Sequence, residues 1–189
     1  MHTSRKRSSA VTVLAVTVLS TALAAPALAS PSDVVVTAGS LGLTAPSVAN
    51  FTGVTLDGAA ETTTAAVGVF TVIDSTGSGS GWNVTVQASQ MAQHDGTGYV
   101  AGGRTLPAGG MSLSAPSVTA DGTSSPTPTV STGPYTIDGG SAVKIASAAT
   151  GEGMGTYDFG ASTITLAVPA NAYAKTYRSD ITVSLVSGP

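Results

Sequence analysis

Polar and apolar residues alternate strictly in three stretches of the chain. From Trp82 to Ala88 apolar side chains occupy every second position, and the same period recurs over residues 163–168 and 181–186. This period predicts strands that bury one face and expose the other, which is typical of antiparallel sheets. Weaker strand patterns lie at residues 33–37, 51–56, 65–73, 111–119 and 142–147.

Turn signals separate these stretches. The dipeptide Asp-Gly, whose two residues suit tight hairpin turns, occurs at Asp57-Gly58, Asp95-Gly96, Asp121-Gly122 and Asp138-Gly139. Residues 121–134 carry three prolines among serine, threonine and glycine, and central strands do not accommodate proline. We therefore predict an all-β fold, a single antiparallel β-sandwich across residues 33–187 of the immunoglobulin-like or a related type, with a surface loop or edge segment near 121–134.

The only tryptophan of the chain opens the first alternating stretch. Trp82 shares its face with Val84 and Val86, whereas Asn83 belongs to the opposite, solvated face. Tryptophan is highly buried on average, and this chain has few other large side chains. We therefore interpret Trp82 as a core anchor; the alternative is an exposed platform on which a ligand stacks.

The first 29 residues have the pattern of a cleaved signal peptide. Three basic residues at positions 5–7 precede an uncharged apolar run, and Ala27-Leu28-Ala29 is a small-x-small cleavage site. The run is too short for a convincing membrane anchor. We expect an exported protein that begins at Ser30, with one β domain over residues 30–189 and no membrane insertion.

Charge and cysteine content exclude several classes of partner and of functional site. Three of the seven basic residues lie in the predicted signal peptide, which leaves four against ten acidic residues and a mature net charge of −6. The four basic residues are scattered along the chain, so we expect no nucleic-acid partner and no docking on an anionic membrane. The chain has no cysteine, which excludes disulfides, a lipid-bearing thiol, thiolate metal ligands and a cysteine nucleophile.

Candidate catalytic groups are few. After the signal peptide the only histidine is His94, next to Asp95 in a glycine-flanked turn, and no Gly-x-Ser-x-Gly elbow is present. Glu61 and Glu152 are the only glutamates, and four of the eight aspartates stand in Asp-Gly dipeptides. We interpret His94 as a solvated turn residue and the carboxylates as turn acceptors, so we expect no catalytic, cofactor-binding or metal-binding residues and no enzyme activity.

Several segments in a fixed order resemble one known family. One segment of the chain has a strand that ends in Asp74, then a Gly/Ser turn, then Gly81-Trp82-Asn83-Val84. This segment resembles the first signature of the WxL-domain proteins, which are exported surface proteins of Gram-positive bacteria. The glycine-rich segment at 151–157 and the closing stretch at 175–185 follow in the family's order. Here valine replaces leucine at Val84 and tryptophan at Val183, and Ser75-Thr76 stands where the family often has arginine. The motif positions are therefore Asp74, Gly81, Trp82, Val84, Val183 and Leu185.

The resemblance implies a β-rich domain at the cell surface that binds the cell wall, with peptidoglycan as the ligand and a membrane-anchored WxL-interacting protein as a companion. Trp82 and Val183 are both in phase with apolar neighbours, so we interpret the motif as a folding signature and place the binding surface elsewhere. Tyr173 and Tyr177 are the best exposed aromatic candidates for ligand contact, the alternative being ordinary half-buried tyrosines. Two other functions stay open: an assembly protein that docks on a partner or self-associates through β edges, and a secreted enzyme with an unrecognised site.

Overall fold

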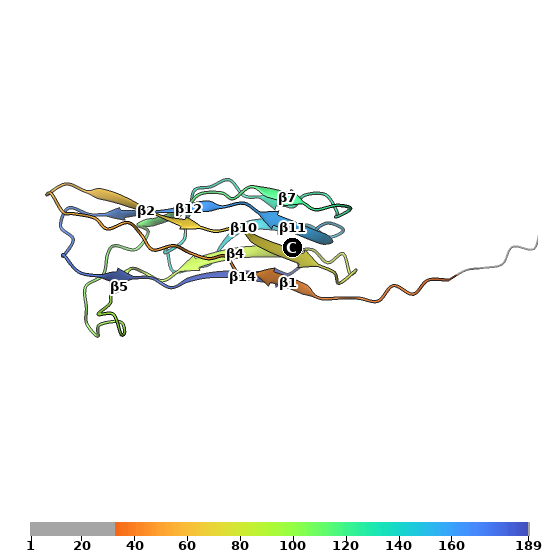
Figure 1. The fold of residues 1–189 in the computed structure, drawn as a ribbon, viewed down its shortest axis with the longest axis horizontal. Helices are drawn as coiled ribbons and strands as arrows, with labels where there is room; N and C mark the ends of the chain where they lie inside the picture. The colour runs from red at the N-terminus through yellow and green to blue at the C-terminus, as the bar shows by residue number, and fades with distance from the viewer. Residues whose placement is uncertain (1–32, 189) are drawn as a thin grey trace, which may run out of the picture. The chain divides into compact units, whose positions relative to one another are not determined.

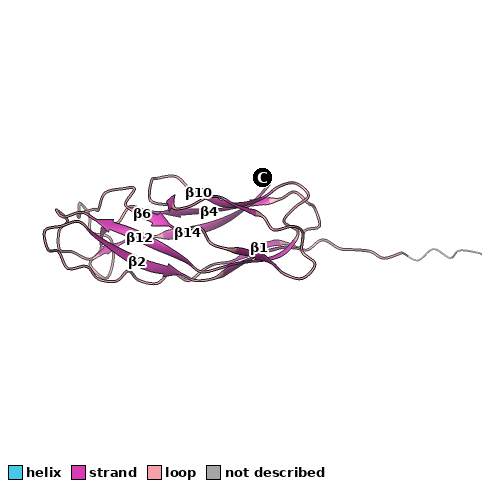
Figure 2. Ribbon diagram, turned by 90° about the horizontal axis from the view of Figure 1, so that it is seen from above, coloured by secondary structure: helices cyan, strands magenta, loops and turns pink. Residues whose placement is uncertain are grey.

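A computed structural model describes residues 33–188, which form fourteen strands and no helix (Figures 1 and 2). The chain divides into two units, Met1–Val35 and Val36–Pro189. In the first unit only residues 33–35 are described, and they form no strand; the predicted signal peptide at 1–29 lies outside the described residues. Within residues 33–188, no helix is long and apolar enough to span a membrane.

All fourteen strands belong to the second unit. They are β1 (Leu41–Thr44), β2 (Glu61–Val67), β3 (Phe70–Asp74), β4 (Trp82–Ala88), β5 (Ala92–Gln93), β6 (Met111–Leu113), β7 (Val118–Ala120), β8 (Thr129–Val130), β9 (Tyr135–Thr136), β10 (Val143–Ala148), β11 (Gly155–Phe159), β12 (Ser162–Val168), β13 (Tyr177–Arg178) and β14 (Ile181–Ser187).

The strands form three four-stranded sheets and one two-stranded sheet. Their orders are β1-β3-β11-β7, β14-β4-β10-β8, β2-β12-β6-β9 and β13-β5. Every pairing is antiparallel, so the predicted all-β, antiparallel class is confirmed. No two neighbours in a sheet are consecutive along the chain.

Short connections link the first and third sheets. The chain crosses between them at residues 68–69, 114–117 and 160–161, joining β2 to β3, β6 to β7 and β11 to β12. The single strands predicted at 65–73 and 111–119 are therefore wrong, because each is two strands in different sheets. Gly68 and Pro116 interrupt them: a side chain at Gly68 would lie 2.6 Å from Ser47 Oγ, and proline cannot donate a ladder hydrogen bond.

Of the other predicted strands, some are confirmed and some are wrong. The strands predicted from Trp82, at 142–147, at 163–168 and at 181–186 are confirmed by β4, β10, β12 and β14. The strands predicted at 33–37 and 51–56 are wrong, because neither segment forms a strand. Val34, Val35 and Val36 are 85–89 % exposed, which shows that a valine-rich sequence alone does not make a strand without a pairing partner.

The Asp-Gly turns also differ from the prediction. Since consecutive strands never pair, none of these dipeptides closes a hairpin between named strands. Gly58, Gly96 and Gly122 do adopt positive φ, but at the fourth dipeptide the positive φ belongs to Gly140. The segment 121–134 is irregular apart from β8, which lies at the edge of the second sheet.

One hydrophobic cluster joins the three large sheets. It contains Phe70 and Phe159 of the first sheet, Trp82 of the second, and Met111 and Ile164 of the third. The rings of Phe70 and Phe159 stack at 4.5 Å between centroids. In Figure 1, β7 and β11 lie at one end of this unit and β2 and β5 at the other.

Candidate functional site

Trp82 is the centre of the family-like signature, and it is completely buried. Its indole Nε1–H donates to the carbonyl of Gly153 at 2.9 Å. The ring packs obliquely against Tyr157, with centroids 5.6 Å apart, and edge-on against Phe159 at 6.4 Å. The interpretation of Trp82 as a core anchor is confirmed, and the stacking-platform alternative is wrong because no face of the ring reaches solvent.

The glycine-rich segment covers this indole. Gly153 has a φ of 75°, and a Cβ there would overlap Ala148 Cβ and lie 2.5 Å from Trp82 Nε1. Gly81 has a φ of 74°, and a Cβ there would overlap the Ala148 carbonyl oxygen. Glycine is thus required at both positions by close approach as well as by backbone conformation.

Asn83 does not lie on a solvated face, as the alternation predicted. It is 9 % exposed, because β14 pairs with β4 and brings Val186 opposite Asn83. Its Nδ2 donates to the Gly188 carbonyl at 2.5 Å, and Gly188 N–H donates to Gly81 at 2.9 Å. The Asn83 side chain therefore links Gly188, the last described residue, to the start of β4 beside Trp82.

The remaining motif residues also have packing and turn contacts. Val84 is fully buried, while Val183 and Leu185 are half-buried and pack against the core. Asp74 is 4 % exposed, and its Oδ1 accepts hydrogen bonds from the backbone N–H and hydroxyl of Thr76 at 3.0 and 2.7 Å. Each of these contacts is a packing or turn contact within the domain.

Tyr173 lies in a different region and is 53 % exposed. The Arg104 guanidinium carbon stands 4.0 Å above its ring centroid, a cation–π geometry. Both side chains line a cleft of about 430 Å³ with Asn171 and Pro107. The cleft thus combines an aromatic ring, a cation and an amide side chain.

Tyr177 is half-buried in β13, although no strand pattern was evident there in the sequence. It pairs with Gln93 of β5, and its hydroxyl donates to the Tyr173 carbonyl at 3.0 Å. It lines a second cleft, of about 640 Å³, together with Phe51 and Arg178. The two tyrosines singled out from the sequence are therefore neighbours that line different clefts.

His94 also lines the second cleft, and the prediction that it is solvated is wrong. It is 7 % exposed, because its backbone N–H donates to Thr176 beside β13 and its ring packs edge-on against Tyr99 at 5.5 Å. Gly96 N–H donates to its Nδ1 at 2.9 Å, and Arg178 Nη1 lies 3.1 Å from its Nε2.

Several carboxylates of the described residues, whether beside His94 or elsewhere, accept hydrogen bonds from backbone N–H groups. Hydrogen bonds from the Thr97 hydroxyl, the Thr97 N–H and the Gly98 N–H lower the pKa of Asp95 to about 2, as expected of a turn acceptor. Asp138 departs from the turn interpretation, since it is 3 % exposed and accepts from Met111 N–H at 3.1 Å. Among residues 33–188, no group of three or more histidine or carboxylate side chains could hold a metal ion.

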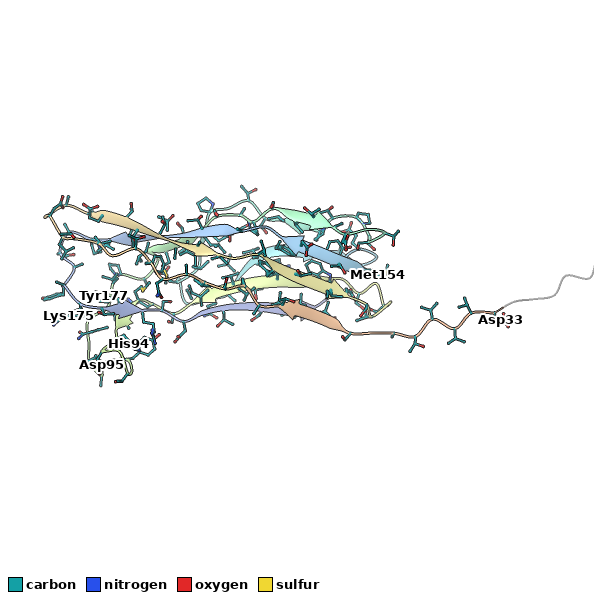
Figure 3. All side chains as sticks on the ribbon, in the orientation of Figure 1. Asp33, His94, Asp95, Met154, Lys175 and Tyr177 are labelled. Carbon is teal, nitrogen blue, oxygen red and sulfur yellow. The ribbon has the colours of Figure 1, made fainter. Side chains whose placement is uncertain are left out.

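Three of the four basic residues within residues 33–188, Arg104, Lys175 and Arg178, lie at this end of the unit. Lys175, Tyr177, His94 and Asp95 lie together, away from Met154 of the glycine-rich segment (Figure 3). Arg178 pairs with Ala92 in β13-β5, and the next residue after Arg104, Thr105, bridges Ala92. The interpretation of the cations as scattered is thus wrong in space. We call this region, defined by β5, β13, Arg104 and Tyr173, the β5–β13 end.

The described residues define an antiparallel all-β domain with a buried tryptophan signature and a polar, aromatic and partly cationic β5–β13 end. The family model for the WxL domain, described as surface cell wall-binding, matches residues 29–189. The chain belongs to the WxL domain family, a family of cell-surface, cell-wall-binding domains. Neither curated proteins nor solved structures gave a significant match.

Proposed function

We propose that the domain binds peptidoglycan non-covalently, without catalysing a reaction, through its β5–β13 end. The observation that carries this proposal is the exposed Tyr173 ring with the Arg104 guanidinium 4.0 Å above it, since both side chains line a cleft that Asn171 also lines. Sugar rings pack against aromatic side chains, and their amide and hydroxyl groups need directional polar partners. This cleft offers both kinds of contact.

Local charge supports the same location. The mature chain has a net charge of −6, yet Arg104, Lys175 and Arg178 lie at one end. Cations there can pair with the carboxylates of wall peptides, although the whole domain repels an anionic polymer.

The contacts of the titratable groups support a binding role without catalysis. Both ring nitrogens of His94 face N–H groups, so the imidazole is not placed against a hydroxyl nucleophile, as a general base must be. Asp95 is occupied with its turn and Asp138 with β6. No pair of free carboxylates faces across either cleft in the part of the chain that the structure describes.

We further propose export with removal of residues 1–29, and a membrane-anchored WxL-interacting protein as a partner at the surface. As scaffold, we infer a single sandwich in which the first and third sheets act as one layer against the second. The short crossings at 68–69, 114–117 and 160–161 and the shared hydrophobic cluster support this interpretation.

Co-sedimentation tests the proposal. Purified protein comprising residues 30–189 is incubated with sacculi stripped of wall polymers other than peptidoglycan, then washed at rising salt. We expect retention that rising salt reduces little, because the overall negative charge means that long-range attraction does not hold the domain. Protein that stays wholly in the supernatant at every salt concentration would refute the proposal.

A second function, assembly through strands, is favoured by one observation. Val34 and Val35 in the first unit are 85 % and 89 % exposed without forming a strand, and β14 lies at the edge of its sheet. In strand addition between copies, an unpaired apolar segment of one copy pairs with the exposed sheet edge of another. Size-exclusion chromatography separates the possibilities: an oligomer that a Val34→Ser, Val35→Ser variant abolishes supports assembly, whereas a monomer rejects it.

A further inference from the structure

His94 has two N–H donors as neighbours and no acceptor. Gly96 N–H lies 2.9 Å from Nδ1, and Arg178 Nη1 lies 3.1 Å from Nε2. A neutral imidazole has one N–H and one acceptor nitrogen, and a guanidinium is only a donor. One ring nitrogen must therefore direct its own proton at a donor, in a residue that is only 7 % exposed.

The backbone decides which nitrogen this is. The Gly96 N–H belongs to a turn that Asp95 Oδ1 holds by accepting from Thr97 and Gly98 at 2.8 and 2.9 Å. Arg178 is an exposed side chain on a flexible stem. We therefore assign Nδ1 as the acceptor of the fixed turn and Nε2 as the protonated nitrogen. The Nε2–H and the Arg178 guanidinium are then two donors 3.1 Å apart at one point in the lining of the second cleft.

A carboxylate is the acceptor that suits this point. It can accept from the guanidinium and the imidazole together, with the short, strong geometry of charge-assisted hydrogen bonds. Asp180 also lines the cleft, with its Oδ2 bonded to the Tyr99 hydroxyl at 2.8 Å. A neighbouring carboxylate disfavours a doubly charged anion such as phosphate more than a singly charged one.

The rest of the cleft indicates what carries the carboxylate. Phe51, Met91 and Ile181 line it beside the two donors, so a small apolar group next to the anion finds apolar contact. We propose that the second cleft binds the C-terminal carboxylate of a short peptide ending in a small apolar residue, with His94 Nε2–H and Arg178 as its donors. This inference rests on the proposed function, because it assigns the second cleft to the peptide stems of peptidoglycan, which end in alanine.

The test uses N-acetyl-D-alanyl-D-alanine as the probe and its C-terminal amide as the matched control. Long-range ¹H–¹⁵N spectra of the histidine ring should show the Nε2–H tautomer, and the dipeptide acid should shift the Nε2 resonance. The amide and inorganic phosphate at the same concentration should not shift it. Arg178→Gln should weaken dipeptide binding about tenfold or more, whereas Lys144→Gln, which removes the same charge from an exposed residue of β10, should leave it unchanged.

Each of the following results would overturn the proposal: an Nδ1–H tautomer, equal shifts with acid and amide, or equal loss in the two variants. A phosphate shift as large as the dipeptide shift would replace the peptide carboxylate by a general anion site and so also overturn it. Sacculi binding is scored separately. If the domain is retained on sacculi and the dipeptide has no effect, this inference fails alone; if retention is lost, the proposed function fails.

Discussion

Replacing Gly153 or Gly151 by alanine isolates the contact between the glycine-rich segment and the indole. The two glycines have similar positive φ angles, 75° and 85°, so each alanine has the same backbone strain of about 1–2 kcal/mol. At Gly151 a Cβ meets nothing within 4 Å, and we expect that strain to be its whole cost.

At Gly153 two costs are added. The Cβ would overlap Ala148 and lie 2.5 Å from Trp82 Nε1, and overpacking in a rigid core costs about 1–3 kcal/mol. Moving the indole away also breaks its hydrogen bond to the Gly153 carbonyl, worth about 1 kcal/mol. The free energy of unfolding should therefore fall by about 2–4 kcal/mol more in Gly153→Ala than in Gly151→Ala.

Urea denaturation followed by the fluorescence of the only tryptophan measures both variants. The native emission of Gly151→Ala should match the wild type, whereas that of Gly153→Ala should shift to longer wavelength as the indole moves. Equal losses of stability, with unchanged native emission in both, would refute the claim that this glycine is needed for contact with Trp82.

Three further substitutions or conditions give sharp outcomes. Trp82→Phe leaves the buried carbonyl partner without a donor, so urea denaturation should show a loss of about 1–3 kcal/mol beyond the effect of smaller ring volume; a loss below 1 kcal/mol in total would contradict the hydrogen bond. Both carboxylate oxygens of Asp138 accept from backbone N–H groups, those of Gly110 and Met111 at 3.2 and 3.1 Å. Asp138→Asn replaces one of these oxygens by an NH2 donor, so thermal denaturation should show a loss of about 1–3 kcal/mol, and no loss would contradict the paired contacts. The Asp95 pKa is lowered to about 2, so its turn contacts are complete above pH 3.8 and weaken as the pH falls toward 2; a Thr97 amide NMR titration with its midpoint near 3.8 would contradict this.

Local signals in the sequence were sufficient for the apolar, buried face of the alternating strands and for Trp82. Period-two alternation depends only on neighbouring residues, and a lone tryptophan in phase with valines belongs to the buried face wherever the strand lies. The breaks at Gly68 and Pro116 were also readable, since both residues interrupt a strand. The sequence did not show to which sheet each half of the segments 65–73 and 111–119 belongs, because the pairing partners of these strands lie far away along the chain.

The same distance explains the errors at the site. Asn83 is buried by contact with Gly188, and His94 by a segment that includes Arg178, 84 residues further on. The basic residues are scattered in sequence but gathered by the pairing of β5 with β13. Exposure of a polar residue in a strand or turn follows from tertiary neighbours, and alternation does not report them.

The central claim is that the β5–β13 end holds the domain on peptidoglycan, and a pair of equally exposed side chains tests it most directly. Tyr173 is 53 % exposed at that end, and Val186 is 52 % exposed on β14; neither truncation removes a buried contact of the core. In co-sedimentation with purified sacculi, Tyr173→Ala should weaken retention about fivefold or more, because stacking on the ring and the support of Arg104 are lost together, while Val186→Ala should be retained like the wild type. Equal retention of both variants and the wild type would contradict the account.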